Sequence, residues 1–223
     1  MARSARRLSS SRRVHVPRLR DRERRRRLAT IAIVAVGFVA VAALLVSVSR
    51  LSTDARHATA EGLSGPAPGF TLPSVSGEEV SLDSYRDRKN VLLFFNEGYG
   101  CAPCWQQSVE IQARLDELTA TDTEYLVVTV DPGSLARSEV ERWDLTVPVL
   151  FDPGRSVASA YKTLGFGMHS DKPNHTFVFV DKAGEIQWWQ DYPSMRAPTD
   201  EVIAKVRALS EASRSIGHPG GTS

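Results

Sequence analysis

Residues 91–104 read VLLFFNEGYGCAPC. The first five are all apolar, which is the pattern of a strand buried on both faces of a sheet. A glycine-containing loop follows, and residues 102–119 then show the apolar spacing of a helix. The only two cysteines of the chain, Cys101 and Cys104, therefore stand where a buried strand is followed by a helix.

Outward from this stretch, the apolar pattern alternates between strand and helix periods. The expected strands are 70–72 and 80–82, which form a small opening hairpin, then 91–95, 125–130, 147–151, 176–180 and 185–190. The expected helices are 102–119, 134–143, a segment through 157–164, and a closing helix with Thr199 as its N-cap. This order predicts an α/β fold with a mainly parallel central sheet, an antiparallel edge hairpin and flanking helices.

Charge is distributed unevenly along the chain. Residues 1–27 hold twelve arginines against Asp21 and Glu23, a net charge of +10, and the other 16 basic and 24 acidic residues leave −8. Such a basic arm is typical of nucleic-acid binding or of the cytoplasmic flank of a membrane helix. The next 21 residues, 28–48, carry no charge, and at about 1.5 Å per residue a helix of them spans the ~30 Å core of a bilayer. We therefore expect a transmembrane helix from Leu28 to Val48 and no nucleic-acid partner.

The position of the arginines predicts the orientation in the cell membrane. Positive residues beside an apolar helix stay in the cytoplasm, so residues 1–27 are the expected cytoplasmic tail of a single-pass protein with an extracytoplasmic domain. Composition predicts a linker at 49–68, a folded domain at 69–214 and a disordered tail at 215–223. A cleaved signal peptide is the alternative, because residues 58–60 have the form of a cleavage site, but the apolar run is longer than in signal peptides.

The Cys-Ala-Pro-Cys motif favours thiol-disulfide exchange. A cysteine at a helix N-terminus lies near unpaired N–H groups and the positive end of the helix dipole, which favour the nucleophilic thiolate. Pro103 suits the first helical turn, because no N–H is needed there. Cys101 is the expected nucleophile, and Cys104, on the packed face, is the expected resolving thiol. A structural zinc site takes about four ligands and the chain has no second cysteine pair, so we expect no metal and no cofactor.

Three segments resemble one known superfamily: APGFTLPSVSGEEVSL (67–82), VLLFFNEGYGCAPC (91–104) and TFVFVDKAGEI (176–186). They are similar to thioredoxin-like proteins, in the redoxin branch that contains alkyl hydroperoxide reductase/thiol-specific antioxidant (AhpC/TSA) domains and membrane-anchored TlpA-like thiol-disulfide oxidoreductases. The resemblance implies a thioredoxin-like fold and a reductase of exported cysteine-containing proteins, with apocytochrome c as one candidate. It also implies a membrane electron donor that reduces the enzyme again.

Departures from the family pattern refine this interpretation. A peroxidatic cysteine of the peroxiredoxin type has Pro seven residues and Thr or Ser three residues before it, where this chain has Phe94 and Gly98. A thiol peroxidase is therefore the disfavoured alternative. TlpA-like enzymes carry a glutamate six residues after the first cysteine, where this chain has Gln107. Glu97, in the loop before Cys101, is the candidate proton acceptor in its place.

The segment before the late strand holds further candidates. Pro173 is the candidate for the superfamily's cis-proline, which shapes the substrate groove, with Asn174 or His175 as alternatives for that position. Copper-carrying thioredoxin-like proteins use two cysteines and a distant histidine, so His169 or His175 would complete such a site in a second alternative. Asp131, which ends a strand, is expected to be a turn residue.

Overall fold

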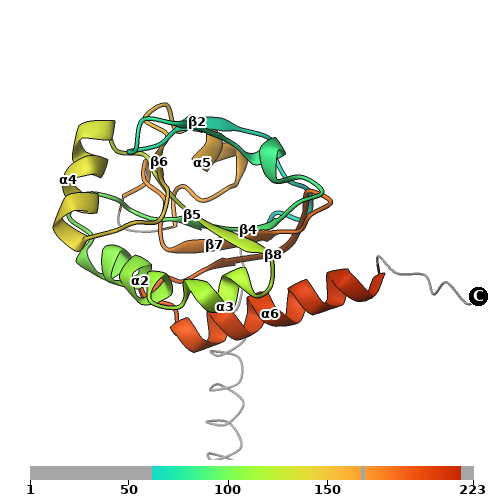
Figure 1. The fold of residues 1–223 in the computed structure, drawn as a ribbon. Coiled ribbons are helices and arrows are strands. Elements are labelled where there is room, and N and C mark those ends of the chain that lie inside the picture. Colours follow the sequence, from blue (N-terminus) through green and yellow to red (C-terminus); the bar gives the residue numbers. More distant parts are fainter. Residues whose placement is uncertain (1–61, 167–168, 217–223) are drawn as a thin grey trace, which may run out of the picture. The chain divides into compact units, whose positions relative to one another are not determined.

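The computed structural model describes residues 62–166 and 169–216. At its centre is a six-stranded sheet with strand order β1-β8-β7-β4-β5-β6 (Figure 1). Its strands are β1 (Gly65–Pro66), β4 (Asn90–Phe95), β5 (Thr123–Thr129), β6 (Val149–Phe151), β7 (Thr176–Val180) and β8 (Glu185–Asp191). A separate hairpin pairs β2 (Thr71–Pro73) with β3 (Glu79–Ser81).

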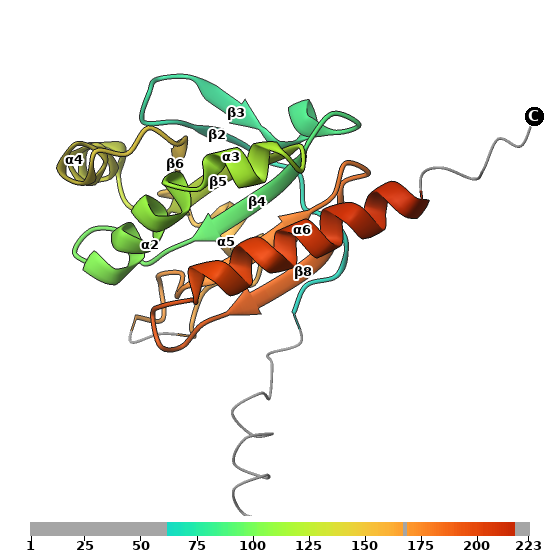
Figure 2. The same cartoon turned by 60° about the horizontal axis from the view of Figure 1, so that its bottom comes forward.

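Both faces of the sheet are covered (Figure 2). The helices are η1 (Leu82–Tyr85), α2 (Ala102–Gln112), α3 (Leu115–Thr119), α4 (Gly133–Trp143), α5 (Ser156–Ala160) and α6 (Thr199–Ile216). Alternate residues of β4 point to opposite faces. Phe94 packs in the cluster formed with α2, α3, α4 and α6, and Phe95 packs in the cluster formed with α5 and the β2–β3 hairpin. Burial on both faces explains why β4 is a continuous apolar run.

The sheet is mixed, whereas the sequence predicted a mainly parallel one. Strands β4, β5 and β6 are parallel neighbours, but β4 with β7, β7 with β8 and β8 with β1 are antiparallel. The β7–β8 hairpin was expected at an edge, yet β7 pairs with the central strand β4, with Phe177 opposite Phe94. The apolar pattern of a strand predicts that it is buried, but it does not predict which strand lies next to it in the sheet. The α/β fold with helices on both faces is confirmed.

The helix predicted over residues 102–119 is interrupted. The backbone leaves helical geometry at Arg114 (φ −126°, ψ 24°), between α2 and α3. Its guanidinium binds Glu117, with Nε 2.6 Å from Oε1, and Asp200 of α6. The break therefore places a cation between α3 and α6. The helix expected through 157–164 is likewise shorter and is the five-residue α5.

Thr199 begins α6 but does not cap it. The carbonyl of Pro198 accepts the N–H groups of Glu201 at 3.0 Å and of Val202 at 3.1 Å. The Thr199 hydroxyl donates to Glu110 at 2.6 Å and accepts from the Gln107 amide at 2.9 Å. This threonine therefore joins α6 to the cysteine-bearing helix α2.

The predicted cytoplasmic tail and the transmembrane helix at residues 28–48 lie outside the described residues. Within residues 62–166 and 169–216, no helix combines the length and apolarity that crossing a bilayer requires. Strand β1 falls inside the range predicted as a linker and pairs with β8. Helix α6 continues to Ile216, past the predicted domain end at residue 214.

Candidate active site

The two cysteines lie at the N-terminus of α2, shortly after the central strand β4. Cys101 is the N-cap residue, Cys104 lies in the first turn, and the two are joined by a disulfide with their Cα atoms 5.4 Å apart. Cys101 is 8% exposed and Cys104 is fully buried. The structure is therefore that of an oxidised dithiol centre with Cys101 on its solvent side.

No side chain caps the N-terminus of α2. The Cys101 carbonyl accepts the N–H groups of Cys104 at 3.0 Å and Trp105 at 3.3 Å. Pro103 stands in the first turn, as predicted, where its missing N–H leaves nothing unsatisfied. In the reduced protein, the positive end of the helix dipole would stabilise a Cys101 thiolate. The arrangement suits attack by Cys101 and resolution by Cys104.

Residues 97–100, the pre-cysteine turn, connect β4 to the active-site helix. Gly98 and Gly100 both have positive φ, +88° and +89°, a region that glycine adopts without strain. The carbonyl of Gly98 accepts two hydrogen bonds at 3.0 Å, from the Cys101 N–H and from Nε1–H of the buried Trp105. The geometry of this turn therefore determines where Cys101 sits.

Glu97, the predicted proton acceptor, lies in the pre-cysteine turn and faces His169. Its Oε1 is 3.3 Å from Nε2 of that histidine, and its side chain is 18% exposed. The contact joins the turn to the segment that leads into β7.

Asp131, predicted to be a turn residue, is buried against the pre-cysteine turn and is only 5% exposed. Its Oδ2 accepts the backbone N–H of Tyr99 and, at 3.1 Å, the hydroxyl of Thr129. Its Oδ1 lies 3.5 Å from Nζ of Lys172. Asp131 therefore lies in the bend between β5 and α4, as predicted, and its side chain also contacts three segments of the chain.

Glu139 of α4 is a second buried carboxyl group at this turn, which sequence reasoning missed. It is 2% exposed, and it accepts the Gly100 N–H at 3.4 Å and Nε1–H of Trp143 at 2.9 Å.

A sequence signal for the position of Asp131 was present. Asp131 follows a strand that is parallel to β4, so it lies at the same edge of the sheet as the cysteines. For Glu139 the signal was its place on the inward face of α4, one turn after Ala136.

Gln107 stands where the resemblance implies a glutamate, and it is buried. Its Oε1 accepts the Ala197 N–H at 3.0 Å and lies 3.3 Å from Nε2 of His175. Because an amide oxygen only accepts, Nε2 must carry the imidazole proton. Burial, helped by the positive charge of Arg196, lowers the pKa of His175 to about 3. The imidazole is therefore neutral at pH 7, and its bare Nδ1 has no hydrogen-bond partner within the described ranges.

Pro173 lies three residues before β7, on the sheet edge that carries the cysteines. It is buried and bridges to Leu164, and its peptide bond is trans, since none of the described peptide bonds is cis. The next residue, Asn174, donates to Oδ2 of Asp191 at 2.8 Å, and Thr176 donates to Oδ1 at 2.8 Å. Burial raises the pKa of Asp191, and these hydrogen bonds oppose that shift. Asp191 thus fixes the segment that follows Pro173.

The two candidate histidines do not complete a metal site in this arrangement. His169 pairs with Glu97, and His175 contacts Gln107. No group of three or more His, Cys, Asp or Glu residues that could hold a metal ion occurs in the part of the chain that the structure describes.

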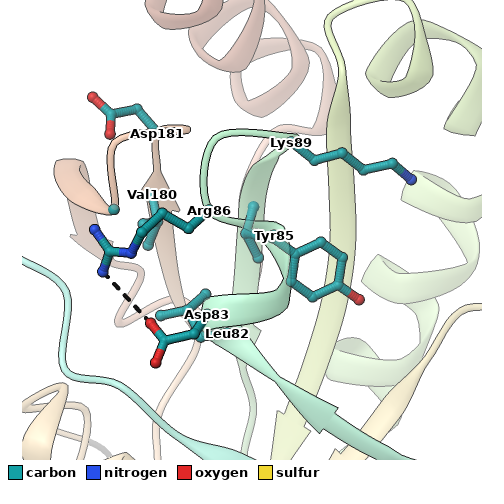
Figure 3. A pocket seen from close by; sticks show the side chains of 9 residues that line it. Leu82, Asp83, Tyr85, Arg86, Lys89, Val180 and Asp181 are labelled. Carbon is teal, nitrogen blue, oxygen red and sulfur yellow. Dashed lines mark ion pairs between the residues drawn. The ribbon is translucent and has the colours of Figure 1, made fainter.

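Figure 3 shows a small pocket, whose lining includes Val91 near the first residue of β4. It is lined by residues that include Tyr85, Arg86 and Lys89, and an ion pair of 3.5 Å joins Arg86 to Asp83 beside it. Its volume of about 10 Å³ leaves room for roughly one water. The cysteines follow the last residue of β4 and not the first, so this pocket is no part of the cysteine site.

Comparison with known proteins places these observations in one family. A family model described as "AhpC/TSA family" matches residues 63–189. The chain is 30% identical over 125 residues to "Putative peroxiredoxin Rv2521" of Mycobacterium tuberculosis (strain ATCC 25618 / H37Rv), covering 54% of this chain and 78% of that protein. It is 28% identical over 130 residues to the thiol-disulfide oxidoreductase ResA of Geobacillus kaustophilus (strain HTA426), covering 58% and 69% respectively.

Solved structures show the same fold. The peroxidoxin BcpB from Mycobacterium tuberculosis superposes with a TM-score of 0.58 at 18% identity, covering 66% of this chain and 97% of that one. AhpC from Enterococcus faecalis gives a TM-score of 0.61 at 16% identity, covering 73% and 96%. The predicted thioredoxin-like fold is thereby confirmed.

Proposed function

Because the chain belongs to the AhpC/TSA family of thioredoxin-like oxidoreductases, we propose that it is a membrane-anchored, extracytoplasmic thiol-disulfide oxidoreductase. Its substrates would be exported cysteine-containing proteins, with apocytochrome c as one candidate. The observation that carries the proposal is the disulfide between the N-cap residue Cys101 and the buried Cys104.

The reaction transfers two electrons from the reduced dithiol to a substrate disulfide. The Cys101 thiolate attacks one substrate sulfur, so the substrate S–S bond breaks, a mixed disulfide forms and one substrate thiolate leaves. Cys104, after losing its proton, attacks the Cys101 sulfur, which releases the second substrate thiolate and closes the Cys101–Cys104 disulfide. A membrane dithiol donor would then reduce this disulfide by the same exchange in reverse.

The membrane location is supported by the sequence. Twelve arginines precede an uncharged run of 21 residues, Leu28 to Val48, a pattern that places the following domain outside the cytoplasm. That compartment is where disulfide-containing substrates occur. The proline beside the resolving cysteine resembles reducing members of the superfamily and favours the reducing direction.

The test is a trapping experiment on the full-length chain, with insulin as the disulfide-containing probe. In Cys104→Ser the attack by Cys101 remains, but nothing resolves the mixed disulfide, so a covalent adduct should accumulate on a non-reducing gel and disappear with reductant. The matched control, Cys101→Ser, should give neither adduct nor insulin reduction. An adduct in Cys101→Ser but not in Cys104→Ser would reverse the two roles, and no adduct in either variant would overturn the proposed function.

Peroxide reduction is the second candidate, because one of the similar proteins is named as a peroxiredoxin. The geometry disfavours it. Phe94 is stacked on Phe177 in the core, with ring centroids 4.5 Å apart, and Gly98 offers no hydroxyl three residues before Cys101. We expect negligible hydrogen peroxide turnover with a thiol reductant. A second-order rate constant above about 10⁴ M⁻¹s⁻¹ would contradict this and favour the peroxidase.

A further inference from the structure

The contacts of Asp131 reach Cys101 through the pre-cysteine turn. Its Oδ2 accepts the Tyr99 N–H, and a Cβ added to Gly98 would lie 1.9 Å from that oxygen, so the carboxylate lies directly against the Gly98 backbone. The Gly98 carbonyl in turn accepts the N–H of Cys101 at 3.0 Å. The peptide group between Gly98 and Tyr99 therefore links Asp131 to Cys101, with its N–H bonded to Asp131 and its carbonyl bonded to the Cys101 N–H.

The charge of Asp131 is shielded from water but only partly compensated. Its side chain is 7% exposed, and its cationic partner is Lys172, at 3.5 Å. Glu139 brings a second buried carboxyl group to the turn, and Glu97 faces His169. A buried negative charge acts over several ångströms, because the protein interior screens it less than water does.

A negative charge near a thiol favours the protonated form of that thiol. In dithiol–disulfide enzymes, a stabilised thiolate stabilises the reduced protein and makes the disulfide a stronger oxidant. The opposite holds when a nearby carboxylate opposes the thiolate, and the reduced dithiol is then a stronger reductant. At Cys101 the helix N-terminus and Asp131 would act in opposite directions.

We propose that Asp131 is a positioning residue for Cys101, which holds the pre-cysteine turn and, through its negative charge, makes the reduced dithiol a stronger reductant. This inference rests on the proposed dithiol–disulfide exchange and names the group that sets its direction. Lys172 carries the positive charge that partly offsets the charge of Asp131.

Two variants separate the charge of Asp131 from its structural role. Asp131→Asn removes the charge but keeps an oxygen that can accept the Tyr99 N–H, and Lys172→Met removes the opposite charge. The control is Asp122→Asn, since Asp122 also pairs with a lysine, Lys182 at 2.9 Å, at the other end of β5. Each full-length protein is equilibrated with glutathione redox buffers, and the fraction of Cys101–Cys104 disulfide is measured.

In Asp131→Asn, the equilibrium constant between the Cys101–Cys104 disulfide and glutathione should shift about three- to tenfold toward the reduced dithiol. The pH at which Cys101 is alkylated should fall. Lys172→Met should shift both quantities in the opposite direction, and Asp122→Asn should change the constant less than about twofold. An unchanged equilibrium constant in Asp131→Asn would overturn the inference. Shifts in the same direction in Asp131→Asn and Lys172→Met would also overturn it, because a loosened turn would shift the constant in the same direction in both variants. A wild-type pair that does not exchange with glutathione would instead remove the proposed function and this inference with it.

Discussion

His175 shows how a single buried side chain can couple protonation to stability. Its ring lies among aromatic rings, with centroids 4.6 Å from Phe94, 5.9 Å from Phe177 and 6.4 Å from Tyr192. Burial lowers its pKa to about 3 in the folded protein, against about 6.5 in an unfolded chain. Between these two values the unfolded chain binds a proton that the folded chain does not. Stability is therefore lost as the pH falls from about 6.5 toward 3.

We predict that His175→Gln weakens the acid sensitivity of folding. The wild type should lose up to about 1.4 kcal/mol of unfolding free energy per pH unit more than the variant below pH 6.5. Asp191 has a raised pKa, so its contribution is lost as the pH rises, but it is present in both proteins and largely cancels in the comparison. Urea unfolding at pH 7, 6, 5 and 4 measures the slopes.

The control is His169→Gln, since His169 has a side chain that is 55% exposed. Its slope should match that of the wild type. Equal slopes for His175→Gln and the wild type would show that His175 does not stay neutral in the folded protein.

At the scale of elements, the pre-cysteine turn offers a matched pair of glycines. Gly98 and Gly100 have nearly the same φ, so a side chain at either position carries the same backbone strain. Their surroundings differ. A Cβ at Gly98 would lie 1.9 Å from Oδ2 of Asp131 and 2.4 Å from Oγ1 of Thr129, whereas a Cβ at Gly100 meets nothing within 4 Å. The turn is therefore tightly packed around Gly98, whereas there is space for a side chain at Gly100.

We predict that Gly100→Ala costs about 1 kcal/mol of unfolding free energy, the price of the backbone strain alone. Gly98→Ala should cost about 2–4 kcal/mol, because it adds overpacking against Asp131. Denaturant unfolding of the two variants measures the difference, and insulin reduction should fall further in Gly98→Ala. Equal losses in the two variants would mean that the turn moves freely away from Asp131.

At the scale of the whole molecule, the proposed topology places the two ends of the chain on opposite sides of the membrane. A protease added to intact cells or spheroplasts should digest the thioredoxin-like domain and leave residues 1–27 protected, because only the domain would be exported. Antibodies against each end, with and without detergent, provide the measurement. Release of a soluble form that begins near residue 61 would contradict the anchor and favour the cleaved signal peptide.

The sequence alone was enough for the features that depend on neighbouring residues. The buried run of β4, the cysteine pair at the start of α2 and the place of Pro103 in its first turn follow from patterns within one or two turns of chain. The ends of elements were less well determined. Arg114 interrupts a helix that the apolar spacing continued, and one of its partners, Asp200, comes from another helix.

The tertiary structure alone decided what surrounds the dithiol. Asp131 lies 32 residues from Tyr99 and His175 lies 68 residues from Gln107, yet each pair is in contact. The antiparallel pairing of β7 with β4 brings the His175 segment to the edge of the sheet where the cysteines lie, and the parallel pairing of β5 with β4 brings Asp131 there. Local sequence encodes strand and helix periods, but the choice of neighbouring strand depends on how the buried surfaces of distant segments pack against one another.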